Sequence, residues 1–430
     1  MKIGVIGVGY VGLATGACLA DVGNHVICVD IDKKKIEHLK KGIMPIYEPG
    51  LREVVDRNKK NKRLSFTVNL KDAVQKSDII FICVNTPAKE NGEPDLCYVE
   101  TVSRQIAEVL SGYKLIVEKS TVPVQTGKKI KETIDLVGEG KLDFDVASNP
   151  EFLREGKAIA DFINPDRIVL GVDSQKAKDL LLKLYKPFKA PLIVTDLNSA
   201  ELIKHASNSF LALKISFINA VSQICDKVGA DVVRVAEGMG YDKRIQRGFL
   251  DAGIGFGGSC FPKDLRAFIK MAEKNGIDFR LLKDVIEINN RQMESFLRKI
   301  EEALWNTKGK TVGVLGLSFK PNTDDMRNAP SIDVINVIQK NGARVKAFDP
   351  QATKKARPLF KDVIFCKDAY QAAKDSDCLV VITEWSEFKD LNMGRIKKLM
   401  KNPIIIDGRN LFDPPQLRRM GFRYIGMGRI

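Results

Sequence analysis

The segment Gly255–Asp264 reads Gly-Phe-Gly-Gly-Ser-Cys-Phe-Pro-Lys-Asp and holds the residue types of a nucleophilic site. Pro262 is typical of the first turn of a helix, so Cys260 should lie beside a helix N-terminus, where the backbone charge and Lys263 favour a thiolate. Asp264 would share a helix face with Cys260. A lone cysteine usually only fills a core, but the glycines, which imply close backbone approach, and the carboxylate favour a nucleophile.

A second motif, Gly-Val-Gly-Tyr-Val-Gly at Gly7–Gly12, follows an apolar strand and precedes a helical stretch. In that context Gly7 permits a tight turn, Gly9 lets the backbone approach a pyrophosphate, and Gly12 allows close helix packing. The helix N-terminus would face the phosphate charge. The motif predicts a dinucleotide site; a glycine turn without a cofactor is the alternative.

Asp30 follows the next predicted strand, His25–Val29. A carboxylate at this position accepts hydrogen bonds from the adenosine ribose and repels a 2′-phosphate, so NAD is favoured over NADP. The neighbouring lysines Lys33–Lys35 leave room for the opposite choice.

A long helix is predicted over Ser199–Val228, where apolar residues follow a helical period. Asn198, with Glu201 three residues on, would cap its start, and Gly229 would end it. Lys204 and Asn208 would project from one side and could act on one ligand atom, although a lysine in a helix is more often solvated.

The elements that position these motifs predict an α/β fold. Strands are expected at 2–6, 25–29, 79–84, 114–118, 144–147 and 168–171, and again near 311–315, 344–348, 378–382 and 403–406. We therefore expect two doubly wound Rossmann-like domains joined by a central helical segment with one long helix. The predicted boundaries are 1–195, 196–297 and 298–430.

Composition is that of a globular enzyme: 430 residues, 44% hydrophobic, 29% charged and a net charge of +15. The basic residues occur in short runs along the chain, which indicates solvated helix faces, or a field that attracts anionic ligands, more than nucleic-acid binding. No apolar run reaches about 18 residues, the start lacks the pattern of a signal peptide, and the eight cysteines form no CxxC pair. We expect a cytoplasmic protein with free thiols and no metal site.

Taken together, the motifs resemble the UDP-glucose 6-dehydrogenase family, within the wider group of nucleotide-sugar dehydrogenases that includes the GDP-mannose and UDP-N-acetylmannosamine enzymes. The resemblance covers most of the chain. It runs through Gly7–Gly12, Val84–Pro87, Glu118–Pro123, Asn149–Gly156, Glu201–Asn208, Gly255–Asp264, Phe319–Pro321 and Asp324–Arg327.

The resemblance implies that NAD oxidises UDP-glucose to UDP-glucuronate in two steps, through a thiohemiacetal and then a thioester on Cys260. GDP-mannose or another nucleotide sugar is the alternative substrate. A catalytically silent NAD-binding or nucleic-acid-binding scaffold is the alternative from another class.

The resemblance also implies roles for individual residues. The catalytic set would be Cys260, Lys204, Asn208, Asp264, Glu151 and Thr121. NAD contacts would come from Gly7, Gly9, Tyr10, Val11, Gly12, Asp30, Lys35, Thr86, Thr121, Glu155, Lys263 and Arg327. The nucleotide sugar would contact Glu151, Phe152, Leu153, Lys204, Asn208, Arg244, Phe249, Leu250, Gly253, Gly257 and Lys320, with Arg244 reaching in from a second subunit.

One departure from the family pattern is the segment Gln246-Arg247-Gly248 after Ile245, where relatives often place a glycine directly. Ser259–Asp264 resembles the UDP-glucose branch. The apolar face of the long helix favours a homodimer or a larger homo-oligomer.

Overall fold

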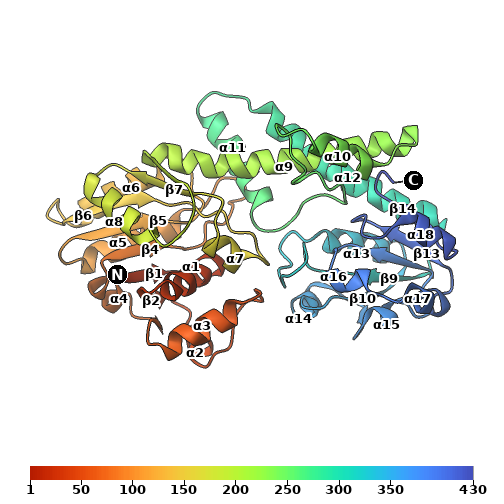
Figure 1. The fold of residues 1–430 in the computed structure, drawn as a ribbon, viewed down its shortest axis with the longest axis horizontal. Helices are drawn as coiled ribbons and strands as arrows, with labels where there is room; N and C mark the ends of the chain where they lie inside the picture. The colour runs from red at the N-terminus through yellow and green to blue at the C-terminus, as the bar shows by residue number, and fades with distance from the viewer. Residues whose placement is uncertain (430) are drawn as a thin grey trace. The chain divides into compact units, whose positions relative to one another are not determined.

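The computed structural model describes residues 1–429 and has an α/β fold (Figure 1). Its contacts divide the chain into two compact units. The first comprises residues 1–207 with 266–277, and the second comprises residues 208–265 with the described chain from 278 onward. The predicted division into three domains stays a prediction.

The first unit is built on a sheet with the strand order β3-β2-β1-β4-β5-β6-β7-β8. Its strands are β1 (Lys2–Ile6), β2 (His25–Val29), β3 (Leu64–Thr67), β4 (Ile79–Ile82), β5 (Lys114–Glu118), β6 (Phe144–Ser148), β7 (Ile168–Val172) and β8 (Leu192–Thr195). All neighbours pair in parallel except β6 and β7, which are antiparallel, so the expectation of a parallel sheet is corrected at that pair.

Helices flank this sheet on both faces, and apolar clusters fill the space between them and the strands (Figure 1). They are α1 (Tyr10–Asp21), α2 (Lys33–Lys40), α3 (Leu51–Lys60), α4 (Leu70–Lys76), α5 (Cys97–Val109), α6 (Thr126–Val137), α7 (Ala158–Ile163) and α8 (Gln175–Tyr185). Strand residues alternate between the two clusters: Val5 faces one and Ile6 the other. Burial on both faces explains why β4 is apolar throughout and why β1 and β5 are apolar between their ends.

The second unit contains the second doubly wound sheet that the sequence predicts, with the order β11-β10-β9-β12-β13-β14 and parallel pairing throughout. Its strands are β9 (Thr311–Leu315), β10 (Arg344–Phe348), β11 (Val363–Phe365), β12 (Cys378–Val381), β13 (Ile404–Asp407) and β14 (Arg423–Gly426). Its helices are α10 (Val232–Gly240), α12 (Arg280–Leu304), α13 (Pro330–Lys340), α14 (Thr353–Ala356), η1 (Arg357–Leu359), α15 (Ala369–Ala373), α16 (Ser386–Lys389), α17 (Met393–Leu399) and α18 (Pro414–Arg419).

The predicted long helix is α9 (Leu197–Val228), and it begins two residues earlier than expected. Asp196, not Asn198, supplies the cap, since its Oδ1 accepts a hydrogen bond of 2.9 Å from the Ser199 amide. Hydrogen bonds from the Ser199 side chain and from its amide lower the pKa of Asp196 to about 2. Gly229 follows the helix at φ +74°, as a terminating glycine should.

Within residues 1–429, no helix is both long enough and apolar enough to span a bilayer. All eight cysteines carry free thiols.

Candidate active site

The glycine-rich loop between β1 and α1 has the geometry of a dinucleotide turn. Gly7 lies at φ +93°, and a Cβ there would come within 2.6 Å of the Cys83 carbonyl oxygen. A Cβ on Gly12 would come within 1.8 Å of the Gly7 carbonyl oxygen, so close packing excludes any side chain. At Gly9 the nearest atom would be 3.9 Å away, on Asn85. The open side at Gly9, beside the N-terminus of α1, fits a pyrophosphate.

Asp30 stands at the carboxyl end of β2, beside this loop. Its carboxylate accepts hydrogen bonds from the amides of Val8 at 2.9 Å and Asp32 at 3.0 Å, and from the Lys35 ammonium at 2.8 Å. Burial alone would raise the pKa of Asp30, but these hydrogen bonds bring it below its usual value. An ionised acceptor here fits ribose hydroxyl groups. Lys35, predicted as a cofactor contact, holds Asp30 in place.

The segment between β5 and α6 carries Thr121 and is fixed from several sides. Thr86 Oγ1 donates to the Thr121 carbonyl oxygen at 2.9 Å, and the His205 ring contacts the Val122 carbonyl oxygen at 2.8 Å. Glu201 accepts from the amides of Gln125 and Gly127, each at 2.7 Å. Glu201 therefore caps α6. The sequence had predicted that it forms a capping box on its own helix, and that prediction is wrong.

Glu151 and Lys204, both predicted as catalytic, form a buried ion pair. Lys204 Nζ lies 3.0 Å from Glu151 Oε1, and the two residues are 4% and 7% exposed. The other Glu151 oxygen accepts from the Leu153 amide at 2.6 Å. Lys204 Nζ also lies over the Phe152 ring, 5.3 Å from its centre. The pairing keeps a cation and a carboxylate oriented in a site with little water.

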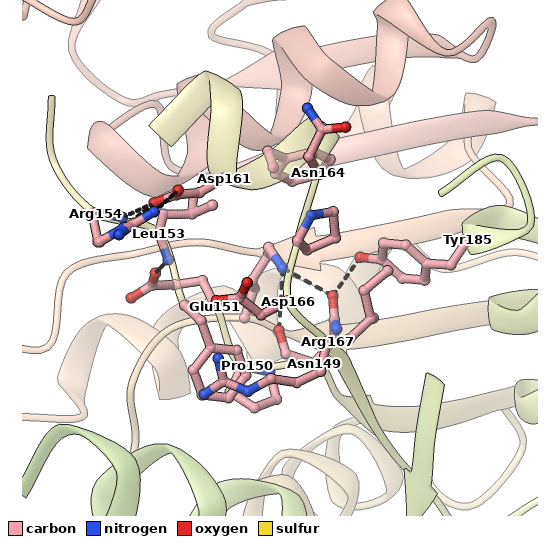
Figure 2. Close-up of a pocket in the computed structure, with 15 residues that line it drawn as sticks. Asn149, Pro150, Glu151, Leu153, Arg154, Asp161, Asn164, Asp166, Arg167 and Tyr185 are labelled. Carbon is pink, nitrogen blue, oxygen red and sulfur yellow. Dashed lines mark hydrogen bonds and ion pairs between the residues drawn. The ribbon is translucent and has the colours of Figure 1, made fainter. Parts of the chain in front are cut away.

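A cavity beside Glu151 is lined in part by residues to which the sequence assigned no role in the site (Figure 2). The Lys119 ammonium donates to Asn149 Oδ1 at 2.9 Å, and the Tyr185 hydroxyl donates to the same oxygen at 2.5 Å. Burial lowers the pKa of Lys119 to about 8. The Arg167 guanidinium lies 3.7 Å from the centre of the Phe152 ring. In the sequence, Lys119 follows an apolar strand and Arg167 precedes one. Their distances along the chain from Glu151 do not predict that either lies near it in the fold.

In the second unit, Cys260 directly precedes α11 (Phe261–Lys274), with Pro262 in the first turn, as predicted. The Asp264 amide donates to the Cys260 carbonyl oxygen at 2.8 Å, which closes that turn. The Ser259 hydroxyl lies 3.6 Å from the Cys260 sulfur. Cys260 is partly exposed, whereas six of the other cysteines are buried and Cys97 is exposed. The helix N-terminus stabilises negative charge on the sulfur.

Asp264 is 1% exposed and connects two other predicted site residues. Its Oδ2 accepts from Asn208 Nδ2 at 2.6 Å, and its Oδ1 lies 2.8 Å from Lys263 Nζ. An amide donor, a carboxylate and an ammonium therefore meet in one small volume at the start of α11. Such a set can hold a proton or a water molecule near the first turn of this helix.

The glycines before Cys260 approach the chain itself. A Cβ on Gly257 would come within 2.1 Å of the Asn328 carbonyl oxygen. Gly258, at φ +82°, packs against the Phe319 ring. The sequence did not show what the backbone of these glycines approaches. In the structure, Gly257 and Gly258 approach the segment that carries Lys320 and Arg327.

The remaining predicted residues of the second unit are dispersed around this loop. Arg327 pairs with Asp325 at 2.6 Å, and Lys320 Nζ lies 5.7 Å from the centre of the Phe319 ring. Arg244 is exposed and pairs with Asp242 at 2.7 Å. The Phe249 ring centre lies 6.4 Å from that of Phe261, the Gly253 amide donates to Asn219 Oδ1, and Leu250 packs in an apolar cluster.

Comparisons with known proteins match three family models along the chain. These are the NAD binding domain of the UDP-glucose/GDP-mannose dehydrogenase family over residues 1–189, its central domain over 198–291, and its UDP binding domain over 313–414. The chain belongs to this family. It is an oxidoreductase with NAD as its cofactor, as the glycine loop and Asp30 predict.

Individual relatives match over nearly their whole length. UDP-glucose 6-dehydrogenase TuaD of Bacillus subtilis (strain 168) is 49% identical over 100% of this chain and 93% of its own. UDP-glucose 6-dehydrogenase of Rhizobium meliloti (strain 1021) is 46% identical over 100% of both chains. Among solved structures, a UDP-glucose dehydrogenase from the hyperthermophilic archaeon Pyrobaculum islandicum matches with a TM-score of 0.93 at 38% identity, over 100% of this chain and 98% of that one.

Proposed function

We propose that this member of the family oxidises UDP-glucose to UDP-glucuronate in two successive steps, through a covalent intermediate on Cys260. The observation that carries the proposal is the position of Cys260, partly exposed at the N-terminus of α11. The names of the relatives support the choice of UDP-glucose. Bound NAD supplies a hydride acceptor in each step.

In the first step the hydroxymethyl group at C6 of the sugar loses a hydride and a proton and becomes an aldehyde. The Cys260 thiolate then adds to the aldehyde carbon, and the new C–S bond makes a thiohemiacetal that can lose a second hydride. The product is a thioester. Water attacks its carbonyl carbon, the C–S bond breaks, and the thiolate is restored with release of the acid.

Buried donors and carboxylates would manage the charge and protons of these steps. Lys204 and Asn208 lie one turn apart on α9 and would stabilise the developing oxyanion. Asp264, with Thr121 and a water molecule, would take and return protons. Glu151, paired with Lys204 at 3.0 Å, would assist proton transfer or thioester hydrolysis.

Stoichiometry tests the mechanism. With limiting UDP-glucose and excess NAD we expect two NADH per sugar, and Cys260→Ser should lower turnover on the order of a thousandfold, because the second oxidation needs the covalent adduct. Cys97→Ser, which changes an exposed thiol, is the matched control. One NADH per sugar, or full turnover by Cys260→Ser, would refute the double oxidation. A preference for GDP-mannose by kcat/KM would assign the same chemistry to the other branch of the family.

We also infer a homodimer formed through α9. Phe210, Phe217 and Ile224 lie at a helical spacing on this helix and are 61%, 48% and 60% exposed. An apolar row of this kind is costly to leave in water. Sedimentation of Phe217→Glu should show a monomer where the wild-type chain shows a dimer, whereas a wild-type monomer would exclude the interface.

A further inference from the structure

A buried glutamate outside the predicted site joins two parts of the NAD-binding unit. Glu48 lies between α2 and α3 and is 6% exposed. Its carboxylate accepts hydrogen bonds from the Gly156 amide at 2.6 Å, from the Ala158 amide at 2.7 Å and from the Tyr10 hydroxyl. The Gly156 amide also donates to the Tyr10 hydroxyl oxygen at 3.0 Å. Three segments far apart in the chain therefore meet at one carboxylate.

The two segments that Glu48 joins are those on which the NAD site depends. Tyr10 is the first residue of α1 and belongs to the glycine-rich loop. Gly156 and Ala158 follow Glu155, a predicted NAD contact, and Gly156 needs φ +81° to make this turn. The loop and the turn also touch directly, through the Gly156–Tyr10 hydrogen bond and the packing of α7 on α1, and Glu48 adds a carboxylate that bonds to both.

The chemistry of the contact favours a fixed geometry. Burial raises the pKa of Tyr10, and the neighbouring Glu48 carboxylate raises it further, so the phenol keeps its proton and remains a donor. Burying a carboxylate is costly unless hydrogen bonds satisfy it, and here two backbone amides and a hydroxyl group do so. Any movement of the turn away from the loop would break at least one of these bonds.

We propose that Glu48 is a positioning residue for NAD. It holds the turn at Glu155–Ala158 against the glycine-rich loop and so keeps both sides of the cofactor site at a fixed separation before NAD binds. Preorganisation of this kind raises affinity because the cost of ordering the site is met during folding. The proposal concerns NAD alone and does not depend on which sugar is oxidised.

Calorimetric titration of the full-length chain with NAD tests this role. The variants are Glu48→Gln, Tyr10→Phe and the double variant, with Glu132→Gln on the exposed face of α6 as the matched control. We expect Glu48→Gln and Tyr10→Phe each to raise the Kd for NAD about fivefold to twentyfold. The double variant should raise it by less than the product of the two, since both residues act through one contact.

The binding stoichiometry separates positioning from a general loss of folding. A structural role alone would lower the fraction of chains that bind and the Tm, with the Kd unchanged in those that do. A Kd within twofold of wild type in both single variants, or effects of the two that simply multiply, would overturn the proposal. Tyr10→Phe removes one oxygen atom and keeps the test valid should Glu48→Gln fail to fold. Failure to oxidise UDP-glucose would refute the proposed function and leave these Kd values interpretable.

Discussion

The two sheets of this protein share a strand order and differ in what they do with the acidic residue after the second strand. Strands β3-β2-β1-β4-β5-β6 of the first unit correspond in order to β11-β10-β9-β12-β13-β14 of the second. In each, an aspartate follows the second strand and accepts an amide hydrogen bond from the turn after the first strand. The Val8 amide lies 2.9 Å from Asp30, and the Leu317 amide lies 2.7 Å from Asp349.

The surroundings of the two aspartates differ. Asp349 is 2% exposed and also accepts from the amides of Ser318, Gln351 and Ala352, and from the Trp385 ring nitrogen. Asp30 is 9% exposed, and Lys35 is its side-chain partner. Asp349 therefore has more internal donors than Asp30 and is less exposed. The same strand order therefore gives the two carboxylates different surroundings, and only Asp30 is a predicted ribose acceptor.

The fifth strands extend the comparison. β5 ends at Glu118 and β13 ends at Asp407, and both carboxyl groups are buried. Asp407 accepts from the amides of Arg409 and Phe412 and from the Tyr424 hydroxyl, whereas Glu118 accepts from the Ser120 amide at 2.5 Å. Burial raises the pKa of both groups, and that of Glu118 reaches about 8. The second unit again surrounds its strand-end acid with more donors.

The largest effect expected from this comparison follows Asp349→Ala. The change leaves several buried N–H groups without an acceptor, so the free energy of unfolding should fall by about 3–5 kcal/mol. Chemical denaturation measures the loss, and NAD titration of the chains that remain folded should give the wild-type Kd. A loss below about 1 kcal/mol would show that Asp349 is not the structural centre of its sheet.

Asp30→Ala should change the Kd for NAD more than the free energy of unfolding. It removes the predicted ribose acceptor, so the Kd for NAD should rise about tenfold to a hundredfold, while the free energy of unfolding falls by about 1–2 kcal/mol. Asp30→Asn, which keeps the shape and one acceptor oxygen, should lie between the wild type and Asp30→Ala. An unchanged Kd in Asp30→Ala would remove the distinction between the two aspartates.

Much of this architecture could be predicted from the sequence, and the missed strands have a common physical cause. The central strands are buried on both faces and therefore read as continuous apolar runs. The strands missed, β3, β8, β11 and β14, are the edges of the two sheets. An edge strand packs on fewer neighbours, so its apolar residues need not be buried: Ile193 and Val194 of β8 are 42% and 38% exposed.

The candidate site divides in a similar way. Residues in contiguous motifs, such as Gly9 and Cys260, could be predicted because local backbone geometry sets their positions. The partners of Glu48, Glu201 and Lys119 could not be predicted, because they lie far away in the chain. Glu201 is the clearest example. The sequence pattern allows it to cap its own helix, but its carboxylate instead accepts from two amides at the start of α6.

A further expected effect, the dependence of stability on pH, distinguishes the two strand-end acids. Because the pKa of Glu118 rises from its ordinary 4.5 to about 8, the folded chain holds a proton between these values that the unfolded chain has lost. Stability due to this group is therefore present at low pH and is lost as pH rises through that window, by at most about 1.4 kcal/mol per pH unit. Glu118→Gln mimics the protonated acid, so its free energy of unfolding should match that of wild type near the acidic end of the window and exceed it above pH 8. Denaturation curves across this range, compared with those of Asp407→Asn, measure the difference.

We expect Asp407→Asn to be destabilised even where Glu118→Gln matches the wild type, because an amide cannot accept all the donors around that residue. A Glu118→Gln curve parallel to that of wild type would mean that Glu118 is ionised in its burial site.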